Sequence, residues 1–196
     1  MIINKKSILK NKNILETEFI KPGDNTPEIF ADTFYLQKQV GEINSVNDIN
    51  RIIKFIKQNV KRKCDIENHL FKRDSKQIWI SGYAESSLDY AMVLESILRQ
   101  LSIPTIHTEL LDLNLKKNKI ISTHSVCEAL FKGKFILLDP STNEINEKHK
   151  AGSNKFKLKN GHNYEVLFRG TDLSECGIES LDDLVNIKRR NKRNII

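Results

Sequence analysis

The chain has 196 residues, of which 39% are hydrophobic and 29% are charged. This length and balance predict one domain with a substantial core and exclude a disordered chain. No stretch approaches the roughly 20 apolar residues that cross a bilayer, and the N-terminus has no apolar core followed by a small-residue cleavage site, so we predict a cytoplasmic protein.

The formal net charge of +7 is concentrated at the two ends of the chain. Residues 1–13 carry +4 and residues 188–196 carry +5, which leaves −2 for residues 14–187. Basic tails contact phosphates without sequence specificity, but frayed and solvated ends are the more common case. A basic, nucleic-acid-associated protein is therefore the weaker alternative.

Three cysteines, Cys64, Cys127 and Cys176, are an odd number without a C-x-x-C spacing. This pattern predicts neither a disulfide framework nor a structural zinc site. We expect each thiol to be a small buried hydrophobic group.

The first third of the chain has one clear regular element. Residues 1–30 are predicted to be irregular because prolines and a glycine interrupt them. Apolar residues at helical spacing predict a helix over 46–60. The polar stretch 61–76 predicts a loop that leads to a short segment around Ile78–Ile80.

A second helix, over 87–101, has a broad apolar face that is typical of a helix packed deep in a domain. Ser86 followed by Asp89 fits a capping signal at its start, and Pro104 ends the turn that follows it. After the helix, strands are predicted over 105–111, 122–131, 134–139 and 164–168, with a polar loop at 114–119 and a last helix near 180–190. Helices followed mostly by antiparallel strands predict an α+β domain.

The hairpin between the second and third strands permits a geometric inference. If Lys132 and Gly133 form a two-residue turn, Phe131 faces Lys134. His124 and Asp139 then lie on one face of the sheet as diagonal neighbours, about 7–8 Å apart at their Cα atoms. A carboxylate bonded to an imidazole fixes its tautomer and stabilises the imidazolium, as a general base requires.

The nucleophile that such a base would activate is expected at the N-terminus of a buried helix. There the helix dipole and the free N–H groups stabilise negative charge. Ser87 occupies this place, and its own N–H can donate to an oxyanion. The chain order Ser, His, Asp and the lack of a G-x-S-x-G elbow at Ser87 argue against an α/β-hydrolase.

Three segments resemble the transglutaminase-like family. SLDYAMVLESILRQLSIPT, from Ser87 to Thr105, is similar to a block that runs Cys-x-Asp-Tyr-Ala, an apolar helix, then Gly-Ile-Pro. HSVCEALFKGKFILLDPST, which begins at His124, is similar to the family's His block. VLFRGTDLSECGIESLDDL is similar to the tail of some bacterial members. The resemblance covers about residues 46–185 and is strongest over 87–142.

The resemblance implies a cysteine-protease-like core in which a nucleophile helix packs on an antiparallel sheet. Together with the charge distribution, we predict an N-terminal extension at 1–40, the domain at 41–187 and a basic tail at 188–196. Ser87 falls on the nucleophile position, His124 on the base and Asp139 on the orienting carboxylate. Members attack peptide or protein amides through a thioester and pass the acyl group to an amine or to water, without a metal or cofactor.

The serine at position 87 is the main departure from this family. A thiol ionises readily beside an imidazolium, whereas an alcohol must lose its proton during the attack itself. Three interpretations stay open: a natural cysteine replaced to trap an inactive enzyme, a natural pseudoenzyme that binds a peptide or protein, and a working serine variant.

Other residues receive weaker assignments. Glu128 lies on the strand face of His124 and matches an acidic position common in the family, although a hairpin-pairing role is equally consistent. Trp79 and Tyr83 precede the helix, where family members often supply an oxyanion donor, but packing is the commoner role. His69, His107, His149 and His162 have no partners at useful spacing and are predicted to lie on the surface.

Overall fold

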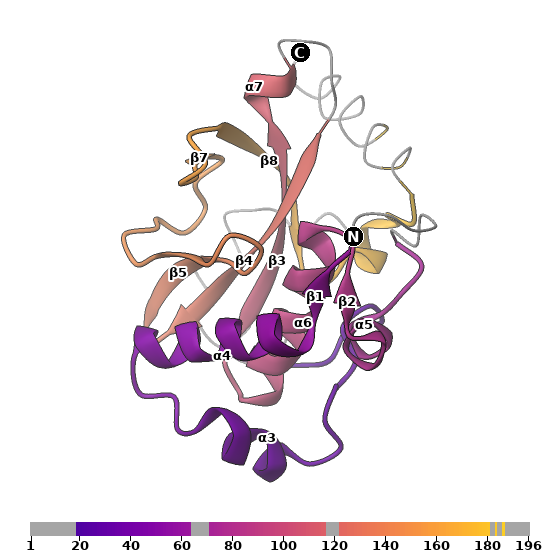
Figure 1. Ribbon diagram of the computed structural model, residues 1–196. Coiled ribbons are helices and arrows are strands. Elements are labelled where there is room, and N and C mark those ends of the chain that lie inside the picture. Colours follow the sequence, from indigo (N-terminus) through magenta and orange to yellow (C-terminus); the bar gives the residue numbers. More distant parts are fainter. Residues whose placement is uncertain (1–18, 64–70, 117–121, 181–182, 184–185, 187–196) are drawn as a thin grey trace.

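The computed structural model describes residues 19–63, 71–116, 122–180, 183 and 186 (Figure 1). The helices are α3 (Thr33–Val40), α4 (Val46–Asn59), α5 (Ser75–Ser81), α6 (Ser87–Gln100) and α7 (Leu113–Lys116), with a 3₁₀ turn at Ser174–Cys176. The strands are β1 (Lys61–Arg62), β2 (Tyr83–Ala84), β3 (Thr105–Asp112), β4 (Thr123–Phe131), β5 (Lys134–Asp139), β6 (Glu144–Asn146), β7 (Lys155–Lys157) and β8 (Asn163–Gly170).

A six-stranded sheet in the order β6-β5-β4-β3-β8-β7 forms the frame of the molecule. All of its neighbouring strands are antiparallel. The short strands β1 and β2 form a separate parallel pair. Figure 1 shows the curled sheet with α4, α5 and α6 gathered on one side of it. The predicted α+β class is therefore confirmed as a mixed fold built on an antiparallel sheet.

Helix α6 is the central helix, and it packs on β3 and β4 as well as on α4 and α5. Every residue from Leu88 to Arg99 is buried. Because water is excluded on all sides, the helix carries apolar residues around most of its circumference rather than along one stripe. The main core lies between this helix, α4 and one face of the sheet.

One buried cation in α6 holds distant segments together. The guanidinium of Arg99 donates to the carbonyl of Thr105 at 2.8 Å, to the carbonyl of Thr171 and to the hydroxyl of Thr26. Since a buried charge is tolerated only when its donors are satisfied, this residue fixes the segments before α3 and after β8 against the helix.

The β4–β5 hairpin has the predicted register, with Phe131 opposite Lys134. Both turn residues have positive φ, 50° at Lys132 and 76° at Gly133. A two-residue turn with this backbone matches the twist of the two strands. The turn therefore sets which residues of the two strands face one another farther along the ladder.

The structure confirms the predicted helices at 46–60 and 87–101 and the four predicted strands. The ends of each element agree with the prediction to within one or two residues. Three helices were not predicted as such: α3, α5, which covers Ile78–Ile80, and α7, which lies in the predicted loop at 114–119. Most of the predicted helix near 180–190 and the whole basic tail lie outside the described residues.

The described part of the predicted N-terminal extension packs on the body of the protein. Ile29, Leu36 and Val40 are buried in the main core, and Phe19 packs on Ile106 on β3. The domain boundary near residue 40 stays a prediction. Among the described residues, none of the helices combines the length and apolar character needed to traverse a bilayer.

Candidate active site

The candidate site lies where β5 separates from β4. The paired residues of this ladder end at Cys127 and Leu138, and β5 itself ends at Asp139. Beyond that point β4 continues toward its start at Thr123 without β5 beside it. His124 and Ser125 lie on this uncovered stretch.

His124 and Asp139 form a close pair there. The ring Nε2 of His124 is 2.7 Å from Oδ2 of Asp139, and the two side chains are 15% and 1% exposed. The diagonal placement follows from the hairpin register. With the proton of Nε2 directed to the carboxylate, Nδ1 is the ring nitrogen that can accept a proton; this tautomer is inferred from the hydrogen bond.

Asp139 is held by several donors besides the imidazole. Its Oδ1 accepts from the Ser141 hydroxyl at 2.7 Å, from the Ser141 N–H at 3.0 Å and from the Thr142 N–H at 3.2 Å. Burial opposes ionisation, but the hydrogen bonds from His124, Ser141 and Thr142 outweigh it and lower the pKa of this carboxyl. The group is therefore a fixed carboxylate.

Ser87 begins α6 and is half-buried. Its Oγ accepts a hydrogen bond from the Ser125 N–H at 3.1 Å. Within the described residues, no hydrogen bond joins this hydroxyl to the His124 ring, so the two are linked through the main chain of β4. Catalytic hydrogen bonds are often long without substrate and tighten when it binds.

The start of α6 is fixed by polar contacts on its outer side. The Ser86 hydroxyl accepts from the Asp89 N–H at 3.4 Å. The Asp89 carboxylate accepts from the Glu85 N–H at 2.8 Å and from the Arg73 guanidinium at 2.6 Å. Burial raises the pKa of Asp89, and these two donors offset that effect only in part. The predicted cap is present, and the same carboxylate also ties down the residues before Ser87.

The aromatic residues predicted near the oxyanion make packing contacts. Trp79 lies in α5, with its ring centroid 5.2 Å from that of Phe30 and 5.4 Å from that of Phe55. The Arg73 guanidinium lies over the Tyr83 ring, with its Cζ atom 4.4 Å from the ring centroid. Their oxyanion roles stay predictions.

Glu128 is fully buried and bonded within the protein. Its carboxylate accepts from the Thr108 hydroxyl at 3.0 Å, and it pairs with His149 at 2.8 Å and with Arg169 at 2.5 Å. Burial opposes ionisation, but these partners lower the pKa of Glu128. This geometry favours a structural role. The substrate role assigned to Glu128 from the sequence stays a prediction.

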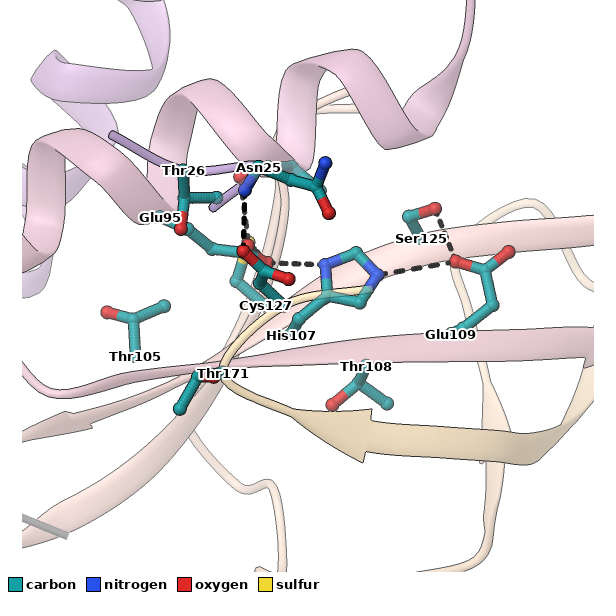
Figure 2. A network of polar contacts seen from close by, with 12 residues as sticks. Asn25, Thr26, Glu95, Thr105, His107, Thr108, Glu109, Ser125, Cys127 and Thr171 are labelled. Carbon is teal, nitrogen blue, oxygen red and sulfur yellow. Dashed lines mark hydrogen bonds and ion pairs between the residues drawn. The ribbon is translucent and has the colours of Figure 1, made fainter. Parts of the chain in front are cut away.

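A second histidine–carboxylate group lies beneath α6 and was missed from the sequence (Figure 2). His107 is fully buried. Its Nδ1 is 2.8 Å from Glu95 on α6, and its Nε2 is 3.5 Å from Glu109 on β3. Burial disfavours the charged ring, but the two carboxylates outweigh it and raise the pKa of His107 to about 10.

The surface placement predicted for the histidines is therefore wrong at two positions. His107 and the His149 side chain, which is 2% exposed, are both buried. His162 is partly exposed and pairs with Asp112 at 2.6 Å, and His69 lies outside the described residues. A signal for His107 was present: Glu109 lies two residues along the same strand and hence on the same face.

Cys127 belongs to this buried group. Its thiol is fully buried, within 3.5 Å of Glu95 and 3.6 Å of the Ala91 carbonyl. Burial and the Glu95 carboxylate raise the pKa of this thiol well above its ordinary value. The predicted buried role is confirmed for Cys127. Across the described residues, no group of three or more His, Cys, Asp or Glu side chains is arranged to hold a metal ion.

A pocket of about 390 Å³ opens near His124. The Tyr164 ring forms part of its wall, and the centroid of this ring is 5.7 Å from that of His124. The other lining residues come from α7, β7 and β8 and combine amide, amine and apolar groups: Leu113, Asn114, Lys155, Phe156 and Asn163.

Comparison with known proteins identifies a similar fold. The chain matches no family model and no curated protein. Its structure is similar to the crystal structure of a putative cysteine protease from Cytophaga hutchinsonii, with a TM-score of 0.62 and 19% identity. The chain has a cysteine-protease-like fold. The match covers 87% of this chain and 51% of that protein, so this chain spans about half the length of the protein it resembles.

The expected cysteine-protease-like core is thus confirmed at the level of fold. At 19% identity the likeness does not carry an activity or a set of site residues.

Proposed function

We propose that this chain is a transglutaminase-like domain that binds peptide or protein amides at Ser87, His124 and Asp139 and is inactive with serine at position 87. One observation carries the proposal. At the start of β4, where β5 no longer pairs with it, the His124 ring is bonded to the buried carboxylate of Asp139. The next residue, Ser125, donates its N–H to the hydroxyl of Ser87 at the start of α6.

The chemistry expected with a thiol at position 87 is acyl transfer. His124 Nδ1 takes the thiol proton, and the sulfur attacks the amide carbonyl carbon. The carbonyl oxygen becomes an oxyanion that N–H groups in the first turn of α6, including that of Ser87, can stabilise. The imidazolium then protonates the leaving amine as the carbon–nitrogen bond breaks. Water or a second amine cleaves the thioester and regenerates the thiol.

A serine at position 87 changes the first step of this reaction. An alcohol is not ionised at neutral pH, so the imidazole must remove its proton during the attack. A histidine and a carboxylate that are arranged for a preformed thiolate–imidazolium pair are not thereby arranged to remove an alcohol proton during the attack. The loss of the thiol does not remove the surface that would contact a peptide, so we propose binding without turnover as the function of the present sequence.

The pocket beside Tyr164 is the proposed place for part of the peptide. Binding pockets combine apolar walls with a few polar groups that set orientation. Phe156 and Leu113 supply apolar surface, and Asn114 and Asn163 supply amides. Tyr164 lines this pocket and its ring centroid is 5.7 Å from that of His124, so a bound peptide can extend from the pocket to the candidate site.

The test is to restore the thiol with Ser87→Cys and to treat the protein with an acylating peptide probe. We expect one label on the peptide that contains position 87, detected by mass spectrometry. In that background, His124→Gln and Asp139→Asn should each slow labelling by at least about 100-fold, because general-base catalysis is worth about 10²–10⁴-fold.

The matched control is His149→Gln, which breaks a histidine–carboxylate pair of similar length elsewhere on the sheet. It should leave the labelling rate unchanged. No label after Ser87→Cys, or equal losses in the control and in His124→Gln, would count against the proposed function.

A further inference from the structure

Ser125 is shared between the candidate site and the buried group beneath α6. Its N–H donates to the Ser87 hydroxyl at 3.1 Å. Its own hydroxyl donates to Glu109 at 2.6 Å. The residue directly follows His124 in β4 and is 1% exposed. The Ser125 side chain is therefore bound to Glu109 in the buried group, while its main-chain N–H contacts residue 87.

The end of β5 explains why this N–H is available to α6. In the β4–β5 register, the residue opposite Ser125 would be Pro140, which follows the last residue of β5. The ladder ends there, and a buried N–H that loses its ladder partner must find another acceptor. The side chain of residue 87 is that acceptor.

The buried group fixes Ser125 through charge. Glu109 lies 3.5 Å from the His107 ring, whose other nitrogen is held 2.8 Å from Glu95. Figure 2 shows the imidazole between the two carboxylates and the Ser125 hydroxyl bonded to Glu109. Buried carboxylates persist as charges only when paired and hydrogen-bonded. The Ser125 hydroxyl therefore bonds at 2.6 Å to a carboxyl group that also contacts the His107 ring, and a hydrogen bond to an ion-paired acceptor is stronger than one to a neutral acceptor.

We propose that Ser125 is a positioning residue: Glu109 holds it so that its N–H is a fixed donor to the nucleophile atom at position 87. This inference rests on the proposed function and adds a group that the Ser, His, Asp set does not contain. When a thiol stands at position 87, a fixed N–H donor stabilises its thiolate and lowers its pKa. The buried group thereby acts on the nucleophile without touching substrate.

The experiment measures the pKa of the introduced thiol in Ser87→Cys. The rate of alkylation by iodoacetamide is followed against pH on the peptide that contains position 87, so that other thiols do not contribute. Adding Ser125→Ala should raise this pKa by about one unit and slow alkylation about tenfold at about pH 6. Ser125→Thr keeps the hydroxyl and should preserve both values.

The matched control is Thr108→Val. Thr108 is a buried hydroxyl bonded to Glu128 at 3.0 Å on the other face of the sheet, so its loss should lower stability without moving the thiol pKa. A thiol pKa that Ser125→Ala leaves unchanged, or that Thr108→Val shifts equally, overturns the inference.

A second readout separates this inference from the proposed function. In the chain with its own Ser87, the Ser125 amide should be protected from hydrogen exchange, and both Ser87→Ala and Glu109→Gln should speed its exchange. If these two variants lose the protection and the separate Ser87→Cys protein takes no acyl label, the positioning role is supported while the proposed function fails. Exchange that neither variant changes overturns the positioning role, whatever the acyl probe shows.

Discussion

Two of the histidine–carboxylate groups, those of His124 and His107, differ in what surrounds them. His124 is 15% exposed and bonded to one carboxylate, Asp139. His107 is fully buried between two carboxylates and touches no solvent. Within the described part of the chain, Nδ1 of His124 has no hydrogen-bond partner, whereas the two carboxylates beside His107 favour the protonated form of its ring. A histidine beside a carboxylate is therefore not enough to mark a catalytic base; the second ring nitrogen must be accessible.

The largest expected difference between the two groups is in stability. Removing one partner from a buried ion pair costs about 3–5 kcal/mol because the other charge is left unpaired. We therefore expect His107→Ala to lower the free energy of unfolding by about that amount in urea denaturation. His124→Ala should cost about 1 kcal/mol, because Asp139 keeps the donors of Ser141 and Thr142.

A compensating variant checks this explanation. Replacing His107, Glu95 and Glu109 together with apolar residues of similar volume removes all three charges. Such replacements are often neutral or stabilising, so the triple variant should be clearly more stable than His107→Ala. Equal instability of the two variants would show that shape rather than unpaired charge causes the loss.

The second comparison uses pH. The pKa of His107 is raised to about 10 from an ordinary 6.5. Between these values the folded state holds a proton that the unfolded state has lost. The contribution of this residue to stability is therefore complete below about pH 6.5 and is lost as the pH rises toward 10, by at most about 1.4 kcal/mol per pH unit.

Denaturation at a series of pH values should show this slope, and His107→Gln should flatten it. The His124→Gln variant is the control and should keep the slope of the parent chain. A slope that survives in His107→Gln would mean that other groups, such as lysines or tyrosines, cause the alkaline loss.

Local patterns predicted the parts of the fold that depend on local physics. The apolar periodicity of α4 and α6 and the turn chemistry at Lys132–Gly133 are properties of neighbouring residues, so the hairpin register that pairs His124 with Asp139 was predictable. The helix α5 was missed because it is short and its N-terminal capping box, Asp74 with Gln77, was overlooked.

The buried group shows where local patterns fail. Glu95 lies in α6, on a helix buried all round, and no periodicity shows which strand residue it meets. The contact with His107 requires the packing of α6 on β3 and β4, which is a tertiary property. The link from Ser125 to Ser87 depends likewise on the point at which β5 ends.

The smallest expected effect concerns the pocket next to His124. Lys155 is the charged residue among those that line it, so a peptide with an acidic residue should bind more tightly there than a neutral one. Lys155→Ala should weaken binding of an acidic fluorescent peptide about two- to fivefold, since exposed charge pairs are worth about 0.2–1 kcal/mol. The effect is small because Lys155 is exposed and Glu165 lies opposite it in the ladder. Lys134→Ala, at the far end of β5, should not change binding; equal losses in both variants would indicate a general effect of net charge rather than this pocket.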